Sequence, residues 1–229
     1  MPVLLNPSRL LPPPSFGVVQ VKSASSNGSS TSVVLDAAPT EGNVLLVFSG
    51  TASNSDLPSL IGGYTSIQNT SVAQGYFRTM WKEAGAAESA TITASRSGSS
   101  TITQLTVMVL EISGLDTASL VDQSASNDSS TMAVSSISTG TTAATDQVDE
   151  IACAFALWYD DDFATPTWTN SFISQTSGSQ TSTNVAFGVS WAAATKILNT
   201  TGAQETTSDW SSGEQPEEAL AAIVTFRAA

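Results

Sequence analysis

The segment Thr101–Ile112, with the sequence TITQLTVMVLEI, constrains the fold more than any other stretch of the chain. Its centre, Leu105–Leu110, is a nearly continuous apolar run, which is typical of a strand that is covered on both faces. β-branched residues such as Val107 and Val109 favour an extended backbone. Because Gly114 follows as a strand-ending residue, we expect Thr101–Ile112 to be a central strand of an all-β domain.

Turn-forming residues divide the rest of the chain into short segments of strand-like composition. The Asn27-Gly28 pair predicts a hairpin between the first two of them. Many short strands at regular spacing predict an antiparallel β-sandwich with a jelly-roll-like order. No internal repeat is evident, and no shift in composition divides the body, so we expect residues 16–229 to form a single domain. The other expected strands lie at 16–23, 30–36, 44–50, 64–68, 75–83, 89–95, 132–138, 151–159, 184–194, 204–208 and 220–227.

The charge composition excludes two classes of partner. Charged residues make up 12% of the chain, and the formal net charge is −13 with only seven Lys and Arg. Binding to nucleic acid depends on clustered basic side chains against phosphate, and an anionic membrane repels an acidic protein. No apolar run is long enough to span a bilayer. We therefore expect neither a nucleic-acid nor a membrane partner.

The absence of histidine restricts the chemistry that the chain can perform. The sequence has no His and one Cys, which excludes Ser-His-Asp catalysis and His-ligated metal sites. Cys153 lies in the apolar run IACAFALWY, so we expect it to be a buried core residue. We expect no enzymatic activity and no cofactor.

Residues 1–15, MPVLLNPSRLLPPPS, form a segment with five prolines. Proline in this number prevents a helix or a central strand and favours an extended chain. The segment lacks the basic start and cleavage site of a secretory signal peptide. It is either a loose terminus or an extended N-terminal arm that docks on a neighbouring subunit, and we favour the arm. Its expected contact residues are Val3, Leu4, Leu5, Leu10 and Leu11.

Three groups of residues are candidates for a binding or catalytic site. Asp160–Asp162 could hold Ca²⁺, but adjacent side chains of an extended segment point in opposite directions, so a solvated loop is the preferred interpretation. Glycosidase carboxylates face each other across a sugar, and nothing in the sequence places Glu217 or Glu218 opposite Asp209. We therefore predict neither a metal site nor a glycosidase.

Trp168 and Trp210 are the third group. Exposed aromatic rings stack on sugars in binding modules, whereas most Trp residues are partly buried in cores or contacts. These two residues lie in or beside predicted loops. We retain them as possible contacts for a glycan or a protein partner.

Several core strands and turns occur in an order that resembles jelly-roll-like domains of tailed-phage virion proteins and related bacterial proteins. In that resemblance, Gly42 and Asn43 form the turn before a core strand, and Gly114 and Leu115 cap the central one. It covers about Val18 to Arg227 and carries no catalytic signature. The matching segments are Pro39–Gly50, Tyr76–Thr93, Leu105–Asp116, Val121–Ser126 and Ser138–Ala156.

The resemblance implies a non-enzymatic virion protein, assembled in the host cytoplasm. We expect a capsid decoration or cement protein, homo-oligomeric, that binds the major capsid protein or other virion subunits through its arm. The alternative is a tail or fibre receptor-binding module that recognises surface glycans. A bacterial extracellular adhesive module is a third hypothesis, which the missing signal peptide disfavours.

We expect Val107, Val109, Leu46, Phe155 and Phe187 to be buried in the core. Replacing Val109 with Asp tests this and the assignment of the central strand. An unpaired charge in an apolar core costs several kcal/mol, about the stability of a domain. We expect Val109→Asp to unfold the protein or to lower its melting temperature strongly, measured by circular dichroism. A variant that melts within a few degrees of the parent contradicts the assignment.

Overall fold

The computed structural model describes residues 16–53, 56–98, 104–129, 135–160, 165–181, 188–210 and 218–229. The predicted N-terminal arm, residues 1–15, lies outside the described residues, as do the first three residues of the predicted central strand. The described chain folds into β-strands joined by turns and loops, and the strand pairs of its sheets are antiparallel.

Two five-stranded sheets form the body. The first sheet contains, in spatial order, β1 (Gly17–Ser26), β7 (Gln104–Ser113), β3 (Val44–Ala52), β5 (Gly75–Glu83) and β4 (Thr65–Val72). The second sheet contains β12 (Ile173–Gln180), β13 (Val189–Leu198), β10 (Glu150–Trp158), β15 (Ala219–Arg227) and β8 (Val121–Ser129). The sheets pack face to face, with β1 against β12 and β4 against β8. This confirms the predicted antiparallel β-sandwich.

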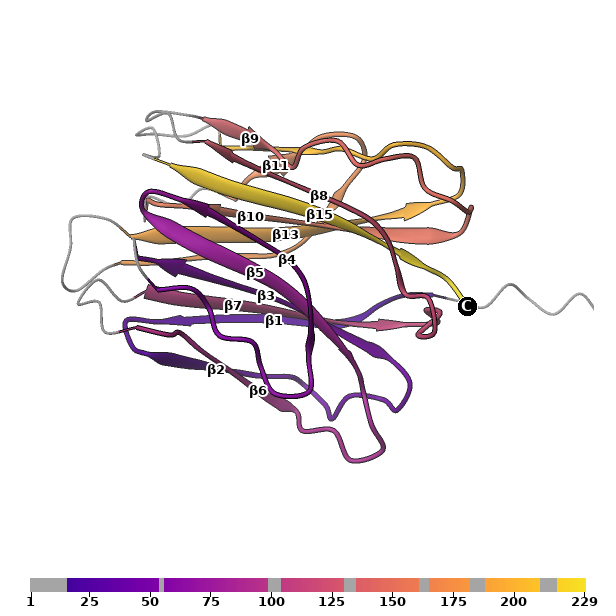
Figure 1. Cartoon of the computed structure of the whole chain (residues 1–229), viewed down its shortest axis with the longest axis horizontal. Helices are drawn as coiled ribbons and strands as arrows, with labels where there is room; N and C mark the ends of the chain where they lie inside the picture. Colours follow the sequence, from indigo (N-terminus) through magenta and orange to yellow (C-terminus); the bar gives the residue numbers. More distant parts are fainter. Residues whose placement is uncertain are drawn as a thin grey trace, which may run out of the picture.

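Two small sheets cover the outer faces of the sandwich. β2 (Ser30–Val34) pairs with β6 (Thr91–Ser95), while β14 (Thr207–Asp209) pairs with both β11 (Thr167–Trp168) and β9 (Ser136–Ser138). Figure 1 shows the four layers stacked, with β9 and β11 above the second sheet and with β2 and β6 below the first. Both large sheets are therefore covered on each face, which explains their continuous apolar strands.

The sequence of β7 reflects the burial of both faces of its sheet. Met108 and Leu110 face the second sheet, whereas Val107 and Val109 face the outer layer of β2 and β6. The predicted core residues Val107, Val109, Leu46 and Phe155 are fully buried, at 0% exposure, so these predictions are confirmed. Phe187, predicted with them, lies outside the described residues. β7 lies between β1 and β3, and β3 is the middle strand of its sheet.

The predicted hairpin at Asn27-Gly28 is wrong. β1 pairs with β7 and β2 pairs with β6, so the two strands that flank this turn belong to different sheets. The turn carries the chain from the first sheet into the outer layer, and the hydroxyl of Ser26 donates to the carbonyl of Ser30 across it at 2.9 Å. A turn-forming dipeptide fixes a reversal of direction, but it does not fix which ladder the next strand joins.

The two large sheets have the same strand order when each is counted within its own half of the chain. The first sheet runs β1-β7-β3-β5-β4, and the second, from its β8 edge, runs β8-β15-β10-β13-β12. β2 with β6 and β9 with β14 are then equivalent outer pairs, and β11 is an addition in the second half. The structure thus contains an internal repeat, β1–β7 and β8–β15, that was not evident in the sequence.

Irregularities in the ladders repeat as well. β4 has a β-bulge after Ser66 and β12 has one after Ser174, in each case after the second residue of the strand. β1 and β8 are also both irregular where they pair with β7 and β15. Bulges set the local twist and direction of a strand, so the two halves share their geometry as well as their order. Because each half forms its own sheet, the arrangement does not show the predicted jelly-roll-like order.

Phe48 and Phe155 meet where the middle strands of the two sheets face each other. Phe48 lies on β3 and Phe155 on β10, and their rings stack with centroids 5.1 Å apart and planes at 12°. Phe77 packs on Phe48 at 5.1 Å. These rings belong to one apolar core to which both halves contribute.

Truncating either stacked ring tests this contact. We expect Phe48→Ala and Phe155→Ala each to lower the free energy of unfolding by about 3–5 kcal/mol, measured by urea denaturation. Because the rings touch, the double variant should lose less than the sum of the two single losses. Val34→Ala, at a side chain that is 63% exposed, is the control and should change stability by about 0.5 kcal/mol or less. Full additivity of the two core substitutions would contradict the contact.

Candidate functional site

An open polar pocket of about 610 Å³ lies beside the outer layer of the second sheet. Three connections and one strand form it: the segment 139–149 between β9 and β10, the turn 169–172 between β11 and β12, the end of β13, and the segment 199–206 between β13 and β14. Its lining consists of hydroxyl, amide, carboxylate and ammonium groups. The lining residues are Thr141, Asn170, Ser171, Lys196, Thr200, Thr201, Gly202, Ala203, Gln204 and Glu205.

The turn 169–172 holds two residues in the left-handed region of backbone space. Asn170 has φ 56° and Ser171 has φ 64°, a conformation that Asn tolerates and that is uncommon for Ser. The amide of Phe172 closes the turn on the carbonyl of Thr169 at 3.2 Å, and the side chain of Asn170 donates to the carbonyl of Glu205 at 2.7 Å. Strained backbone of this kind is concentrated at functional sites.

Glu205 is a fixed negative charge in the pocket lining. Its carboxylate accepts hydrogen bonds from the hydroxyls of Thr141, at 2.6 Å, and Ser138, at 2.7 Å. These two bonds favour the charged form and lower the pKa of Glu205 below its ordinary value. The carboxylate is therefore ionised at neutral pH and can accept further hydrogen bonds from a ligand.

Lys196 supplies a positive charge to the same pocket. Its ammonium group lies 5.7 Å from the centre of the Phe172 ring, in the range of a cation–π contact. It also approaches the side-chain oxygen of Gln204 at 3.4 Å. Among the residues that the structure describes, Lys196 forms no ion pair. The pocket thus presents a cation whose charge no neighbouring described carboxylate neutralises.

Three buried threonines hold one wall of the pocket, and we call them the threonine ladder. Thr139, Thr142 and Thr145 each donate a backbone N–H to a carbonyl on the segment 199–206. Each also accepts, through its hydroxyl, a backbone N–H of that same partner, at 2.9 to 3.2 Å. The partners are Thr206, Gln204 and Gly202, respectively. Such reciprocal pairs leave the wall little freedom to move.

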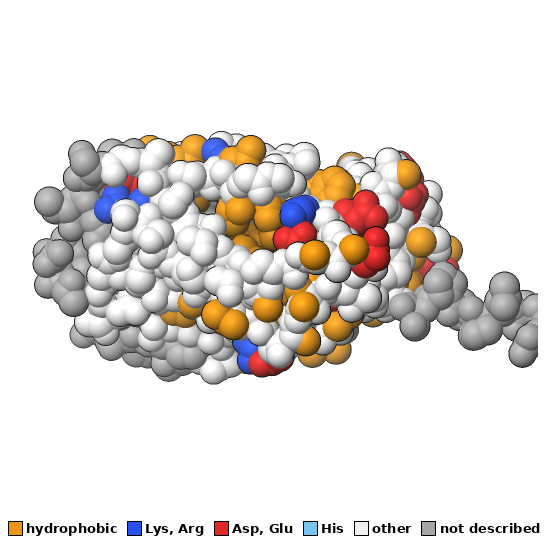
Figure 2. All heavy atoms as spheres, turned by 90° about the horizontal axis from the view of Figure 1, so that it is seen from below, with side chains coloured by type: hydrophobic (Ala, Val, Ile, Leu, Met, Phe, Trp, Pro, Cys, Tyr) orange, Lys and Arg blue, Asp and Glu red, His pale blue; other side chains and the backbone are white. Residues whose placement is uncertain are grey.

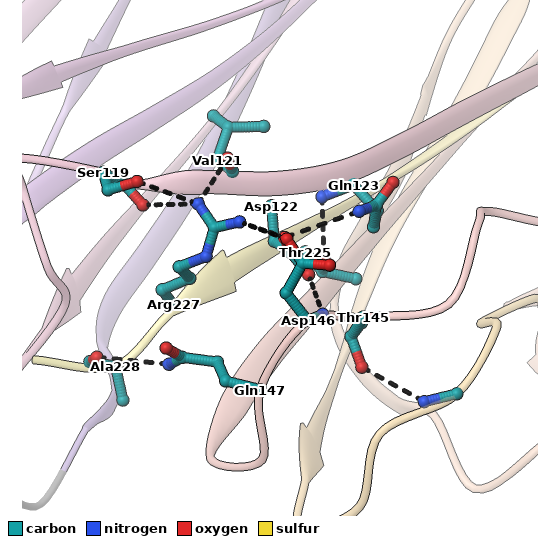
Figure 3. Close-up of polar contacts among 11 residues, drawn as sticks. Ser119, Val121, Asp122, Gln123, Thr145, Asp146, Gln147, Thr225, Arg227 and Ala228 are labelled. Atoms are coloured by element: carbon teal, nitrogen blue, oxygen red, sulfur yellow. Dashed lines mark hydrogen bonds and ion pairs between the residues drawn. The ribbon is translucent and has the colours of Figure 1, made fainter.

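An ionic network anchors the end of the threonine ladder. Figure 3 shows Arg227 at its centre, with ion pairs to Asp122 and Asp146. The backbone N–H of Asp146 donates to the buried carboxylate of Asp122 at 2.8 Å. Asp146 follows Thr145, whose hydroxyl accepts the N–H of Gly202 at 3.2 Å (Figure 3). The network therefore fixes the segment that positions Gly202 at the pocket.

Glu150 adds a titratable group to this network. Burial, and next a hydrogen bond with the Asp122 carboxylate, raise the pKa of Glu150 to about 7, against an opposing bond from Thr225. Two carboxyl groups that share a buried site cannot both ionise at low cost. Glu150 consequently carries a proton in the folded protein at mildly acidic pH.

The predicted contact residues lie elsewhere. Trp210 is 1% exposed, and its ring packs on Trp158 with centroids 5.1 Å apart. Trp210 is buried because the small alanines of the second sheet leave room that its ring fills, and its role as a contact for a glycan or partner stays a prediction. Trp168 is half-buried over the same sheet and does not line the pocket. The arm residues Val3, Leu4, Leu5, Leu10 and Leu11 lie outside the described residues.

The other groups weighed in the sequence do not form a site in the described part of the chain. Asp161, Asp162 and Glu217 lie outside it. Glu218 is buried and accepts the backbone N–H of Gln74 at 2.9 Å. The described residues contain no group of three potential metal ligands, and Cys153 is buried in the core, where desolvation raises the pKa of its thiol.

Sequence reasoning missed the pocket because its residues come from four separate segments. One signal was present: threonine recurs at every third position from Thr139 to Thr145. This spacing matches neither the period of a strand nor that of a helix, so a search for regular elements passes over it.

Comparisons of the chain with protein-family models, with curated proteins and with solved structures find no match. Within the described residues, no helix has the length and apolar character needed to cross a membrane. The groups that line the pocket can donate and accept hydrogen bonds, and they include one positive charge, on Lys196, and one negative charge, on Glu205. This combination suits recognition of a polar ligand.

Replacing Glu150 with Gln tests the buried carboxyl pair. The pKa of Glu150 rises from 4.5 to about 7 in the folded protein, so the folded state holds the proton more tightly than the unfolded state. This contribution is fully present below about pH 4.5 and is lost as pH rises through 7. At most about 3 kcal/mol is involved.

We expect the parent protein to lose unfolding free energy between pH 5 and pH 8, and Glu150→Gln to lose distinctly less. Chemical denaturation at several pH values measures this difference. Glu41→Gln, at an exposed carboxylate, is the control and should follow the parent. Equal pH dependence in all three proteins would contradict the raised pKa.

Proposed function

We propose that this chain is a non-enzymatic structural protein of a virion, most specifically a capsid decoration protein that attaches through residues 1–15. The observation that supports it best is a two-sheet body whose edge strands are joined across the sandwich by side-chain hydrogen bonds. At one edge, Ser23 of β1 bonds to Thr176 of β12 at 3.1 Å, and at the other, Thr70 of β4 bonds to Ser126 of β8 at 2.8 Å. These bonds join the two sheets into one body, and we assign attachment to residues 1–15.

The surface of the body also suits a structural role. Figure 2 shows the face on the side of β2 and β6 as mostly uncharged polar side chains and backbone, with charged side chains in small groups. Hydrophobic side chains gather in a central hollow of this face. A face of this composition lacks the extended basic surface that nucleic-acid binding requires. The proposed partners are the major capsid protein or other virion subunits, with the chain acting as a homo-oligomer.

The energetics favour attachment by several copies at once. Burying the five aliphatic residues of the arm contributes on the order of 10 kcal/mol, and ordering its backbone costs a comparable amount. The prolines reduce that cost because they restrict the free chain. The net gain of one arm is therefore modest, and several arms in a symmetric assembly bind firmly.

Removal of residues 1–15 tests the proposal. We expect the truncated protein to keep the circular dichroism and melting temperature of the parent but to lose co-sedimentation with phage heads that lack the protein. A matched control is the full-length chain with Val3, Leu4, Leu5, Leu10 and Leu11 replaced by Ser, which keeps the length and the prolines. It should fail to bind as the truncated chain does. Full occupancy by either variant would overturn the arm as the attachment segment.

The second candidate function is glycan recognition, in a tail or fibre module or on the outer face of a decoration protein. The observation that favours it is the pocket beside β13, where Glu205, Asn170 and Thr141 offer hydrogen-bonding groups on a fixed backbone. Saccharides present many hydroxyls that such groups can bind. This proposal places recognition in the pocket and not on Trp210.

A further inference from the structure

Both halves of the molecule carry a lysine over an aromatic ring at equivalent positions. In the first half, Lys82 of β5 lies 6.0 Å from the Tyr64 ring, and in the second, Lys196 of β13 lies 5.7 Å from the Phe172 ring. Lys82 pairs with Leu45, three residues before Phe48 on β3, and Lys196 pairs with Ala152, three residues before Phe155 on β10. The equivalent sheets therefore present these two lysines at corresponding places.

The turns that carry the rings also correspond. Tyr64 N–H bonds to the carbonyl of Ile61 at 3.0 Å, as Phe172 N–H bonds to that of Thr169 at 3.2 Å. The residue before each ring has a left-handed backbone, with φ 82° at Gly63 and 64° at Ser171. In the first half, Gly63 adopts the left-handed backbone without strain. In the second half, Asn170 and Ser171 adopt it, and both residues line the pocket.

The third member of each group is different. Glu88 neutralises Lys82 through an ion pair of 2.6 Å, and this bond lowers the pKa of Glu88. In the second half, the residue that approaches the lysine is Gln204, whose uncharged side-chain oxygen lies 3.4 Å from Lys196. Glu88 and Gln204 occupy corresponding positions. The carbonyl two residues after Glu88 accepts the backbone N–H of Leu35, and the carbonyl two residues after Gln204 accepts that of Thr139. Leu35 and Thr139 directly follow the equivalent outer strands β2 and β9.

From this comparison we propose that the pocket binds a saccharide that bears a carboxylate, such as a hexuronic acid or a sialic acid. The ligand carboxylate pairs with Lys196 as Glu88 pairs with Lys82 in the first half. The hydroxyls of the sugar bond to Glu205, to Asn170 and to the threonines of the lining. This inference deepens the second proposal, that the pocket takes a glycan, and it rests on that proposal.

The charges of the pocket select a carboxylate over a phosphate. Lys196 offers one positive charge, and none of the described residues that line the pocket is an arginine, although arginine forks are the side chains best suited to phosphate. A phosphate monoester carries up to two negative charges at neutral pH, and the ionised Glu205 would repel it. A single carboxylate is balanced by Lys196, and neutral hydroxyls can donate to Glu205.

Isothermal titration calorimetry of the full chain at 0.15 M salt tests the proposal with two matched pairs of probes. Sialyllactose is compared with lactose, and digalacturonic acid is compared with a neutral digalactoside. We expect at least one acidic sugar to bind ten-fold or more tightly than its neutral counterpart. The two pairs distinguish a sialic acid from a uronic acid as the preferred ligand.

Three variants connect that difference to Lys196. Lys196→Gln should remove the preference for the acidic sugar. Gln204→Glu gives Lys196 an internal carboxylate partner, as Glu88 is for Lys82. This variant should no longer bind the acidic sugar, and its melting temperature should equal or exceed that of the parent. Glu88→Gln makes the converse change in the first half and should leave sugar binding unchanged.

The outcomes distinguish failure of the carboxylate assignment from failure of glycan recognition as a whole. If acidic and neutral sugars bind equally well, or if Lys196→Gln keeps the preference, the carboxylate assignment is overturned while glycan recognition stands. If no probe binds, both are overturned. If Gln204→Glu fails to fold, the Lys196→Gln result decides.

Discussion

The packing of two five-stranded sheets through one apolar interface is the constraint on which the rest of the structure depends. Phe48 and Phe155 stack at its centre, and both halves of the chain supply the surrounding side chains. A sheet that is covered on one face only would expose an apolar surface. Because the two small outer sheets cover the remaining faces, strands such as β7 and β10 can carry apolar residues on both faces. The loops that form the pocket are carried by this rigid frame.

The repeated frame also shows how position alters the chemistry of a carboxyl group. Glu111 of β7 is buried, which opposes ionisation, but hydrogen bonds from Gln20, Thr40 and Asn43 outweigh burial and lower its pKa. Near the corresponding end of the second sheet, Glu150 adjoins another carboxylate, and its pKa is raised. Similar burial thus favours charge where donors converge and disfavours it where a second acid lies close.

The sequence predicted the sandwich because burial on two faces leaves a direct mark on composition, as in Leu105–Leu110. It failed where the outcome depends on contacts between distant segments. Asn27-Gly28 indicated a turn, but the partner of the following strand is set by β6. Trp210 stood beside a loop, yet alanines on the second sheet made space for its ring. The internal repeat was missed because the two halves share their strand order and the positions of their β-bulges, whereas most of their side chains differ.

Joining the two halves in one chain has a consequence that a symmetric dimer of identical subunits could not have. In such a dimer, a substitution that opens one lysine site opens both, and any cost in stability is doubled. Here Lys82 keeps its internal partner, Glu88, while Lys196 faces a pocket. One lysine site can thus keep a structural ion pair while the other changes its specificity. A fold that contains the same half twice in one chain can therefore have two different sites at equivalent positions.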